Sequence, residues 1–342
     1  MNKSVLSIAI GLILGAGATS SLYADVLSNI VPEDLIEPVG LYSLSNPDVI
    51  LMTAKTVTSN VGVCQLSDNY ANCTLDDIID DLDSTDNFKP EIKVLLTTND
   101  LIPDEKASNA TMRLRGQASR FAPQKSFRIK LDSKKNLWRG ERRIQLIKSV
   151  FDFTRIRNAL SYELLVSIPA LPSLRTQFVD LYVDNGTPTD YGLYTHVEHV
   201  GKEFLINRGW DKDSPVYKAE HFEFRNKDVY KLDAKGKPLD EAAFEKNIEI
   251  KRGKNHAKLA EMLTALNDDK LDFNTQIMGK YFNQENYLSW FAFNILINNT
   301  DTENKNFYLY NPKGKDKFYF MSWDHDFAWG ASLEDPESTI DQ

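Results

Sequence analysis

The 342-residue chain contains little of what several functional classes need. It has two cysteines and no histidine near them, so a Cys/His metal site is not indicated. Its histidines form no recognisable Ser-His-Asp or Cys-His set. Asp and Glu outnumber Lys and Arg, and the net charge of −9 argues against nucleic acid as a partner. What remains is an ordinary globular composition, 42% apolar and 26% charged, large enough for one large domain or two lobes.

Long hydrophobic runs are missing except at the N-terminus. Lys3 gives a positive start, residues 5–16 are mostly apolar, and Leu22-Tyr23-Ala24 forms an imperfect cleavage site. Residues 1–24 are therefore predicted to be a signal peptide, with a retained N-terminal anchor as the alternative. The mature protein is expected in the periplasm or outside the cell, without a membrane span after cleavage.

Residues 25–89 are predicted to form an N-terminal extension. In an exported protein, Cys64 and Cys73 can close a disulfide, and its short loop predicts a stabilisation of about 2–3 kcal/mol. The stretch from 58 to 88 is polar and rich in Asp, which favours a solvated segment. A calcium loop is the alternative, but the D-x-D-x-D-G spacing is missing.

Residues 90–342 mix strand and helix patterns, which predicts an α+β fold. The segments that alternate like strands are residues 91–97, 111–116, 126–131, 177–183 and 191–197. The first three are expected to form an antiparallel sheet. Helical spacing is present at 152–167, which Pro169 ends, and at 281–296. Residues 202–275 carry mixed charge and favour a variable insertion with short helices.

Two acidic segments near the C-terminus carry the most specific chemical signal. Asp301 and Asn306 are five residues apart, and Asp324 and Asp326 are two apart on a predicted strand, where they would share a face. Kinase-type phosphoryl transfer needs one Asp facing the acceptor hydroxyl, and an Asn and another Asp holding magnesium. The H-R-D and D-F-G triplets of protein kinases are absent here. An ordinary turn is the alternative for the first segment, and a solvated pair for the second.

Five blocks of sequence, in order, resemble those of the CotH family, the spore-coat-protein-H-like atypical kinases. The family typically reads RGxSS…PKKSYRIKL, RNALAYEL, GLYLLTEQV, NxDxxxxNxYLY and WDxDxxFG. This chain has RGQAS…PQKSFRIKL, RNALSYEL, GLYTHVEHV, NTDTENKNFYLY and WDHDFAWG in the same order between Ile92 and Gly330. It departs from the family at Gln124, which replaces the first Lys of a pair, and at Trp329, which replaces Phe.

The resemblance implies an atypical protein-kinase-like, two-lobed fold. An N-terminal antiparallel sheet and a mainly helical C-terminal lobe are expected. It also implies transfer from ATP, with magnesium or manganese, to Ser or Thr of a protein acceptor. Asp301 would accept or orient the proton of the acceptor hydroxyl, and Asn306 would ligate the metal. Asp324 and Asp326 would complete the metal site, because two close carboxylates need a cation.

The basic stretch from 115 to 130 is predicted to contact phosphate, since Arg offers a fork of donors and Lys a point charge. Its candidate residues are Arg115, Gly116, Ser119, Lys125 and Lys130. Lys125 is the first choice for the phosphate lysine and Lys130 the second. Glu163, on the following helix, is the candidate partner of that lysine, and Glu198 is placed near the adenine. A solvated sheet face and a solvated helix Glu are the alternatives.

Three functions remain open from the sequence. The first is a secreted kinase that phosphorylates a protein. The second is a non-catalytic extracellular scaffold with the same fold, favoured by the scarcity of ATP outside the cytoplasm. The third keeps ATP but transfers AMP, because a remote kinase-like fold can bind the nucleotide reversed.

Overall fold

The computed structural model describes residues 31–44, 48–57, 73–82, 89–103 and 108–330. The predicted signal peptide and Cys64, one half of the predicted disulfide, lie outside these residues, so both stay predictions. Among the helices within the described ranges, none has the length and apolar character needed to cross a membrane.

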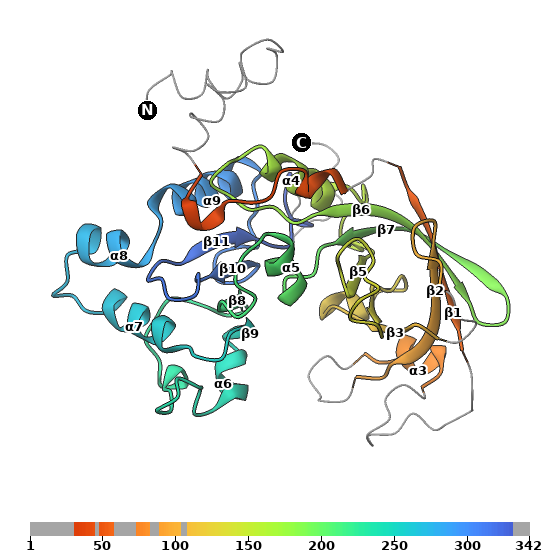
Figure 1. Cartoon of the computed structure of the whole chain (residues 1–342), viewed down its shortest axis with the longest axis horizontal. Coiled ribbons are helices and arrows are strands. Elements are labelled where there is room, and N and C mark those ends of the chain that lie inside the picture. Colours follow the sequence, from red (N-terminus) through yellow and green to blue (C-terminus); the bar gives the residue numbers. More distant parts are fainter. Residues whose placement is uncertain (1–30, 45–47, 58–72, 83–88, 104–107, 331–342) are drawn as a thin grey trace, which may run out of the picture.

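Seven strands of the described residues close a barrel, which lies on the right of Figure 1. They are β1 (Ile50–Thr56), β2 (Ile92–Thr98), β3 (Ala110–Leu114), β4 (Phe127–Leu131), β5 (Arg143–Ile147), β6 (Thr176–Asp184) and β7 (Pro188–Val197). Neighbouring strands pair antiparallel, except that β1 and β6 are parallel, with Ile50 opposite Val179. Along β3 and β4 buried apolar residues alternate with partly exposed polar ones, which fills the interior of the barrel.

The five predicted strands are all present, and β2, β3 and β4 form the expected antiparallel sheet. β1 lies in the segment that the sequence assigns to an N-terminal extension. Because β1 pairs with both β2 and β6, the barrel runs across the predicted boundary at residue 90.

A second sheet has the strand order β11-β10-β8-β9, and its neighbours all pair antiparallel. Its strands are β8 (Val216–Ala219), β9 (Ile248–Arg252), β10 (Phe307–Tyr310) and β11 (Tyr319–Ser322). β8 and β9 come from residues 202–275, so this segment contributes two strands to the sheet besides its short helices, and its assignment as a variable insertion stays a prediction. The C-terminal part therefore combines several helices with a sheet that the sequence did not indicate, and this sheet is built from buried side chains such as Tyr217, Phe307 and Phe320.

Helices pack on both sheets. α9 (Gln284–Leu296) contacts β11 and α6 (Glu241–Glu245) contacts β9, while α4 (Arg157–Val166) contacts β6 and β7 of the barrel and α3 (Leu75–Ile79) contacts β3. The other α-helices of the described residues are α5 (Lys202–Asn207), α7 (Ala257–Leu266) and α8 (Gly279–Tyr281). α9 begins where the side chain of Asn283 accepts a hydrogen bond from the backbone N–H of Asn286. α4 ends shortly before Pro169, which cannot continue a helix.

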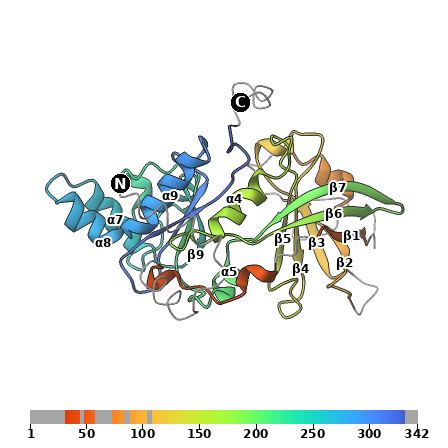
Figure 2. The ribbon, with the colours of Figure 1, turned by 90° about the horizontal axis from the view of Figure 1, so that it is seen from above.

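Buried apolar side chains form two separate clusters, one inside the barrel and one around the second sheet. Figures 1 and 2 show the barrel on one side of the molecule and the second sheet with α7–α9 on the other. In Figure 2, α4 lies between them. The fold is therefore α+β, as predicted, whereas the two-lobed arrangement of a kinase stays a prediction.

Candidate functional site

The loop after α9 brings Asp301 and Asn306 together. The Nδ2 of Asn306 donates to Oδ2 of Asp301 at 2.8 Å, and Nζ of Lys305 lies 2.7 Å from Oδ1 of Asp301. Asn306 has a φ of 58°, a left-handed conformation that Asn adopts more readily than most residues. Because the amide nitrogen of Asn306 is the donor to Asp301, its oxygen is the atom that can meet a cation.

Asp324 and Asp326 follow β11 and do not lie on a strand. β11 ends at Ser322, and Asp324 has a φ of 60°, so the chain turns there. The prediction that the pair shares one face of a strand is therefore wrong. The turn nevertheless brings the two carboxyl groups within hydrogen-bonding reach of each other. His325, between them, is buried with its ring 5.0 Å from that of Tyr162, and burial lowers its pKa to about 3.

Asp152, Asp301, Asp324 and Asp326 form what we call the acidic cluster. Burial raises the pKa of Asp326 well above its ordinary value, and the charges of the other three carboxylates raise it further. Burial also raises the pKa of Asp324, while the positive charge of Arg115 acts against this rise. Like charges this close are stabilised by protons or by a cation, so the cluster has the electrostatics of a cation site.

The donor set decides which cation fits. Within the described residues, no group of three or more His, Cys, Asp or Glu side chains is placed to hold a metal ion. The predicted ligand set has only two carboxylates, those of Asp324 and Asp326, together with the amide oxygen of Asn306. Magnesium commonly takes one or two carboxylates and completes its shell with water and phosphate oxygens, so these oxygen donors fit magnesium or manganese.

Asp152 is a member of the cluster that no sequence pattern singled out. Its buried carboxylate accepts from the backbone N–H of Thr154 at 2.9 Å and from that of Arg157 at 3.0 Å, at the start of α4. Arg157 in turn donates to the backbone carbonyl of Asp326 at 3.5 Å. The available signal, an Asp two residues before a Thr and just ahead of a helix, is typical of an ordinary cap.

Beside the acidic cluster lies a basic cluster made of Arg115, Arg128, Arg143, Lys218 and Lys251. The arginines come from the outer face of the barrel and the lysines from β8 and β9 of the second sheet. Burial, together with the charges of neighbouring arginines, lowers the pKa of Arg128 to about 9. The Nε of Arg143 is buried without a hydrogen-bond partner in the described part of the chain. Lys218 pairs with Glu220 at 2.6 Å and Lys251 with Glu249 at 2.8 Å, so the arginines are the members best suited to an anion with several charges, such as phosphate.

Arg115 connects the two clusters. Burial lowers its pKa, whereas the carboxylate of Asp324 acts to raise it. Its guanidinium carbon lies 5.9 Å from the centre of the Trp323 ring. Lys218 also acts on Asp324, because its charge lowers the pKa of that carboxyl. The acidic and basic clusters are therefore parts of one electrostatic site.

The other residues predicted to bind phosphate are Gly116, Ser119, Lys125 and Lys130. Gly116 has a φ of 93° and forms a tight turn after Arg115, since a Cβ there would lie 2.0 Å from Oγ of Ser119. Lys125 donates to a backbone carbonyl of the same turn at 2.6 Å. Lys130 lies on the outer face of β4. Within the described residues, no contact joins either lysine to the acidic cluster.

Glu163 and Glu198 lie away from the two clusters. Glu163 is exposed on α4 and makes no hydrogen bond or ion pair with another described residue, so the predicted pair with Lys125 is not formed. Glu198 is fully buried, and its carboxylate pairs with Arg175 at 2.9 Å and Arg208 at 3.0 Å. Because both of its oxygens are engaged inside the protein, its expected place near an adenine is not supported.

Comparison with known proteins identifies a family. A protein-family model described as CotH kinase protein matches residues 112–340, which begin within β3 and include both acidic segments. A search of curated proteins finds no significant match. Since the family model covers well over half of the sequence, the chain belongs to the CotH kinase protein family.

Proposed function

We propose that the protein is an exported kinase that transfers the terminal phosphate of ATP to a Ser or Thr hydroxyl of another protein, with magnesium or manganese. Membership of the CotH kinase family supports kinase-like chemistry. The observation that carries the proposal is the meeting of Asp301 and Asn306 with the buried carboxyl pair Asp324 and Asp326, directly beside Arg115. These are the residue types that phosphoryl transfer requires.

Asp301 takes the proton of the acceptor hydroxyl in this proposal. Its carboxylate is held from two sides, because Asn306 contacts one oxygen and Lys305 the other. A carboxylate fixed in this way keeps one orientation toward an approaching hydroxyl, and positioning is the main contribution that a protein makes to phosphoryl transfer.

The divalent cation would be held by Asn306, Asp324 and Asp326. When bound, such a cation neutralises charge on the phosphate oxygens. The positive charges of Arg115 and Lys218 favour the ionised form of Asp324 and so partly offset the repulsion between the carboxylates. Asp152 contributes negative charge to the site, and through its contact with Arg157 it holds the start of α4 near the pair.

The basic cluster, and not Lys125, is proposed to contact the phosphates. Lys125 is engaged with a backbone carbonyl away from the acidic cluster, whereas Arg115 acts directly on the charge of Asp324. The Nε of Arg143 adds a buried donor that has no partner among the described residues. A polyphosphate here would satisfy that donor and relieve the repulsion among the cations.

The direct test is labelling of the purified mature protein, alone or with candidate acceptor proteins, by ATP with magnesium or manganese. We expect a Ser or Thr residue to gain a phosphate, identified by mass spectrometry of the product. A product that carries AMP in place of phosphate would show that the protein catalyses nucleotidyl transfer. Failure to bind ATP with either metal in calorimetry would favour the non-catalytic scaffold.

A second measurement tests the cation site without relying on turnover. Magnesium or manganese with a nonhydrolysable ATP analogue should raise the melting temperature, because a ligand of the folded state stabilises it. At a ligand concentration about 100 times Kd, the gain is roughly 2.7 kcal/mol. Asp324→Asn or Asp326→Asn should remove most of the gain that depends on the metal. An unchanged metal response in both variants would mean that the cation binds elsewhere.

A further inference from the structure

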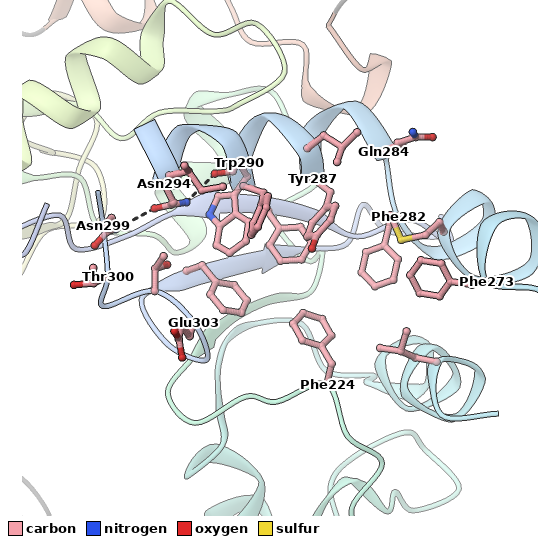
Figure 3. A pocket seen from close by; sticks show the side chains of 18 of the residues that line it. Phe224, Phe273, Phe282, Gln284, Tyr287, Trp290, Asn294, Asn299, Thr300 and Glu303 are labelled. Atoms are coloured by element: carbon pink, nitrogen blue, oxygen red, sulfur yellow. Dashed lines mark hydrogen bonds between the residues drawn. The ribbon is translucent and has the colours of Figure 1, made fainter. Parts of the chain in front are cut away.

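A large aromatic cavity lies next to the loop that carries Asp301. It has a volume of about 820 Å³ and is bounded by α9, the segment before α8, and residues 298–303 of the loop. Its floor is made of the buried rings of Phe282, Trp290, Phe307 and Phe320. Figure 3 shows Trp290 and Tyr287 under α9, Phe282 and Phe273 side by side near its start, and Phe224 across the space from α9. A concave, mostly apolar site of this size is a usual place for a ligand.

Two buried polar atoms in the lining have no hydrogen-bond partner within the described residues. One is the indole Nε1 of Trp290, a residue that is 6% exposed, and the other is the side-chain oxygen of Asn299, which is 7% exposed. In Figure 3, Asn294 and Asn299 lie beside the nitrogen-bearing edge of the Trp290 ring. Leaving a buried donor and a buried acceptor unpaired costs roughly 1–3 kcal/mol each, so an occupant that pairs both is favoured.

The charge of the cavity lining restricts the occupant further. Among the described lining residues, Glu303 is the only charged one, and it is exposed at the end of the cavity formed by the loop. The exposed rim has no other charge: Leu288, Phe291 and Ile295 are each about half exposed or more, and its polar members Asn274, Gln284, Asn298 and Thr300 are uncharged. The surface therefore suits a ligand with apolar groups and one positive charge placed near Glu303.

We propose that this cavity docks an apolar segment of the acceptor protein that carries a Lys or Arg near its acceptor hydroxyl. A peptide backbone supplies both a carbonyl for the Trp290 N–H and an N–H for the Asn299 oxygen, which an acyl chain cannot do. Thr300 and Thr302, the neighbours of Asp301 in sequence, both line the cavity, so a segment bound there lies beside the proposed base. The assignment of this segment to the acceptor rests on the proposed kinase function.

Binding of labelled peptides in the absence of nucleotide tests the docking site by itself. The probe is a fluorescent peptide with one Ser, a run of Leu and Tyr, and one Lys, and its control replaces Leu and Tyr by Gln. Fluorescence anisotropy should show at least roughly tenfold tighter binding of the apolar peptide. Ile295→Glu should abolish that preference, because it places a charge in the apolar rim. Ile206→Glu is the matched control on α5, with an exposed Ile that does not line the cavity.

A charge exchange tests the orientation of the segment. Glu303→Lys should weaken binding of the Lys peptide and improve binding of the same peptide with Glu in place of Lys. Several results would overturn the proposal: equal binding of the polar peptide, unchanged binding by Ile295→Glu, or displacement of the peptide by a fatty acid. A dimer of the wild type that Ile295→Glu dissociates would assign the cavity to a second copy of this chain.

The two proposals can fail separately. Peptide binding that Ile295→Glu abolishes, in a protein that never labels an acceptor, would keep the docking site and refute the kinase. Labelling of acceptors that is indifferent to the apolar segment and to Ile295→Glu would keep the kinase and refute the docking site.

Discussion

Replacing Asp301 by Asn should lower the rate of phosphate transfer by roughly 10²–10⁴-fold, the usual contribution of a positioned general base. Asn has almost the same shape as Asp, and its side-chain oxygen can still accept the hydrogen bond from Asn306. What it loses is the negative charge that receives a proton. The measurement is the initial rate of acceptor labelling at saturating ATP and metal.

The fold should survive this change. The ion pair that Asp301 makes with Lys305 is partly exposed, and such pairs contribute only about 0–1 kcal/mol. Asp269→Asn is the matched control, because Asp269 is exposed and makes no hydrogen bond with another described residue. Labelling by Asp301→Asn at the rate of the wild type and of this control would remove Asp301 from the role of base.

Glu198→Gln should destabilise the protein by about 3–5 kcal/mol at neutral pH. The neutral amide would leave the guanidinium groups of Arg175 and Arg208 buried without the carboxylate that now contacts both. Arg175 would keep Glu141, at 3.2 Å, as a partner, and Arg208 would keep Glu37 at 2.6 Å. The change is measured as a shift of the midpoint of urea unfolding.

The pH dependence of this effect has a definite sign. Burial acts to raise the pKa of Glu198, but the charges of Arg208 and Arg175 outweigh it and lower the pKa below its ordinary value of 4.5. A lowered pKa stabilises the folded state above pH 4.5, and this contribution is lost as the pH falls through the folded pKa. The difference between wild type and Glu198→Gln should therefore shrink below pH 4.5. Glu163→Gln, at an exposed and unpaired Glu, should change stability little at any pH.

Local patterns were sufficient to predict most of the barrel strands and α9. Alternation of apolar and polar residues depends only on near neighbours in the sequence, and β3 and β4 show it clearly. β8 and β9 were missed because their strands are short and lie among charged residues. Their identity as strands comes from pairing with β10, which lies far along the chain, and this pairing leaves no local signal.

The sequence predicts most of the acidic cluster but misses most of the basic cluster. The spacing of Asp301 and Asn306 within one loop is a local property, and the structure brings them into contact. Lys218, on β8, and Arg143, on β5, come from strands of different sheets, and the site depends on where the fold places those strands. No spacing in the sequence indicates that arrangement, so the sequence points instead to Lys125, the nearest lysine in a matching block.

The parallel pairing of β1 with β6 sets an order of assembly. Chains are made from the N-terminus, so β1, β2, β3, β4 and β5 can assemble as an antiparallel ribbon before β6 exists. Until β6 arrives, the outer edge of β1 has backbone donors and acceptors without partners, which is the form in which strands join other chains and aggregate. Because Ile50 and Val179 are so far apart in sequence, closing the barrel costs loop entropy and is expected to be a late, slow step. The chain would thus need protection from self-association until residues 176–184 are available to pair with β1.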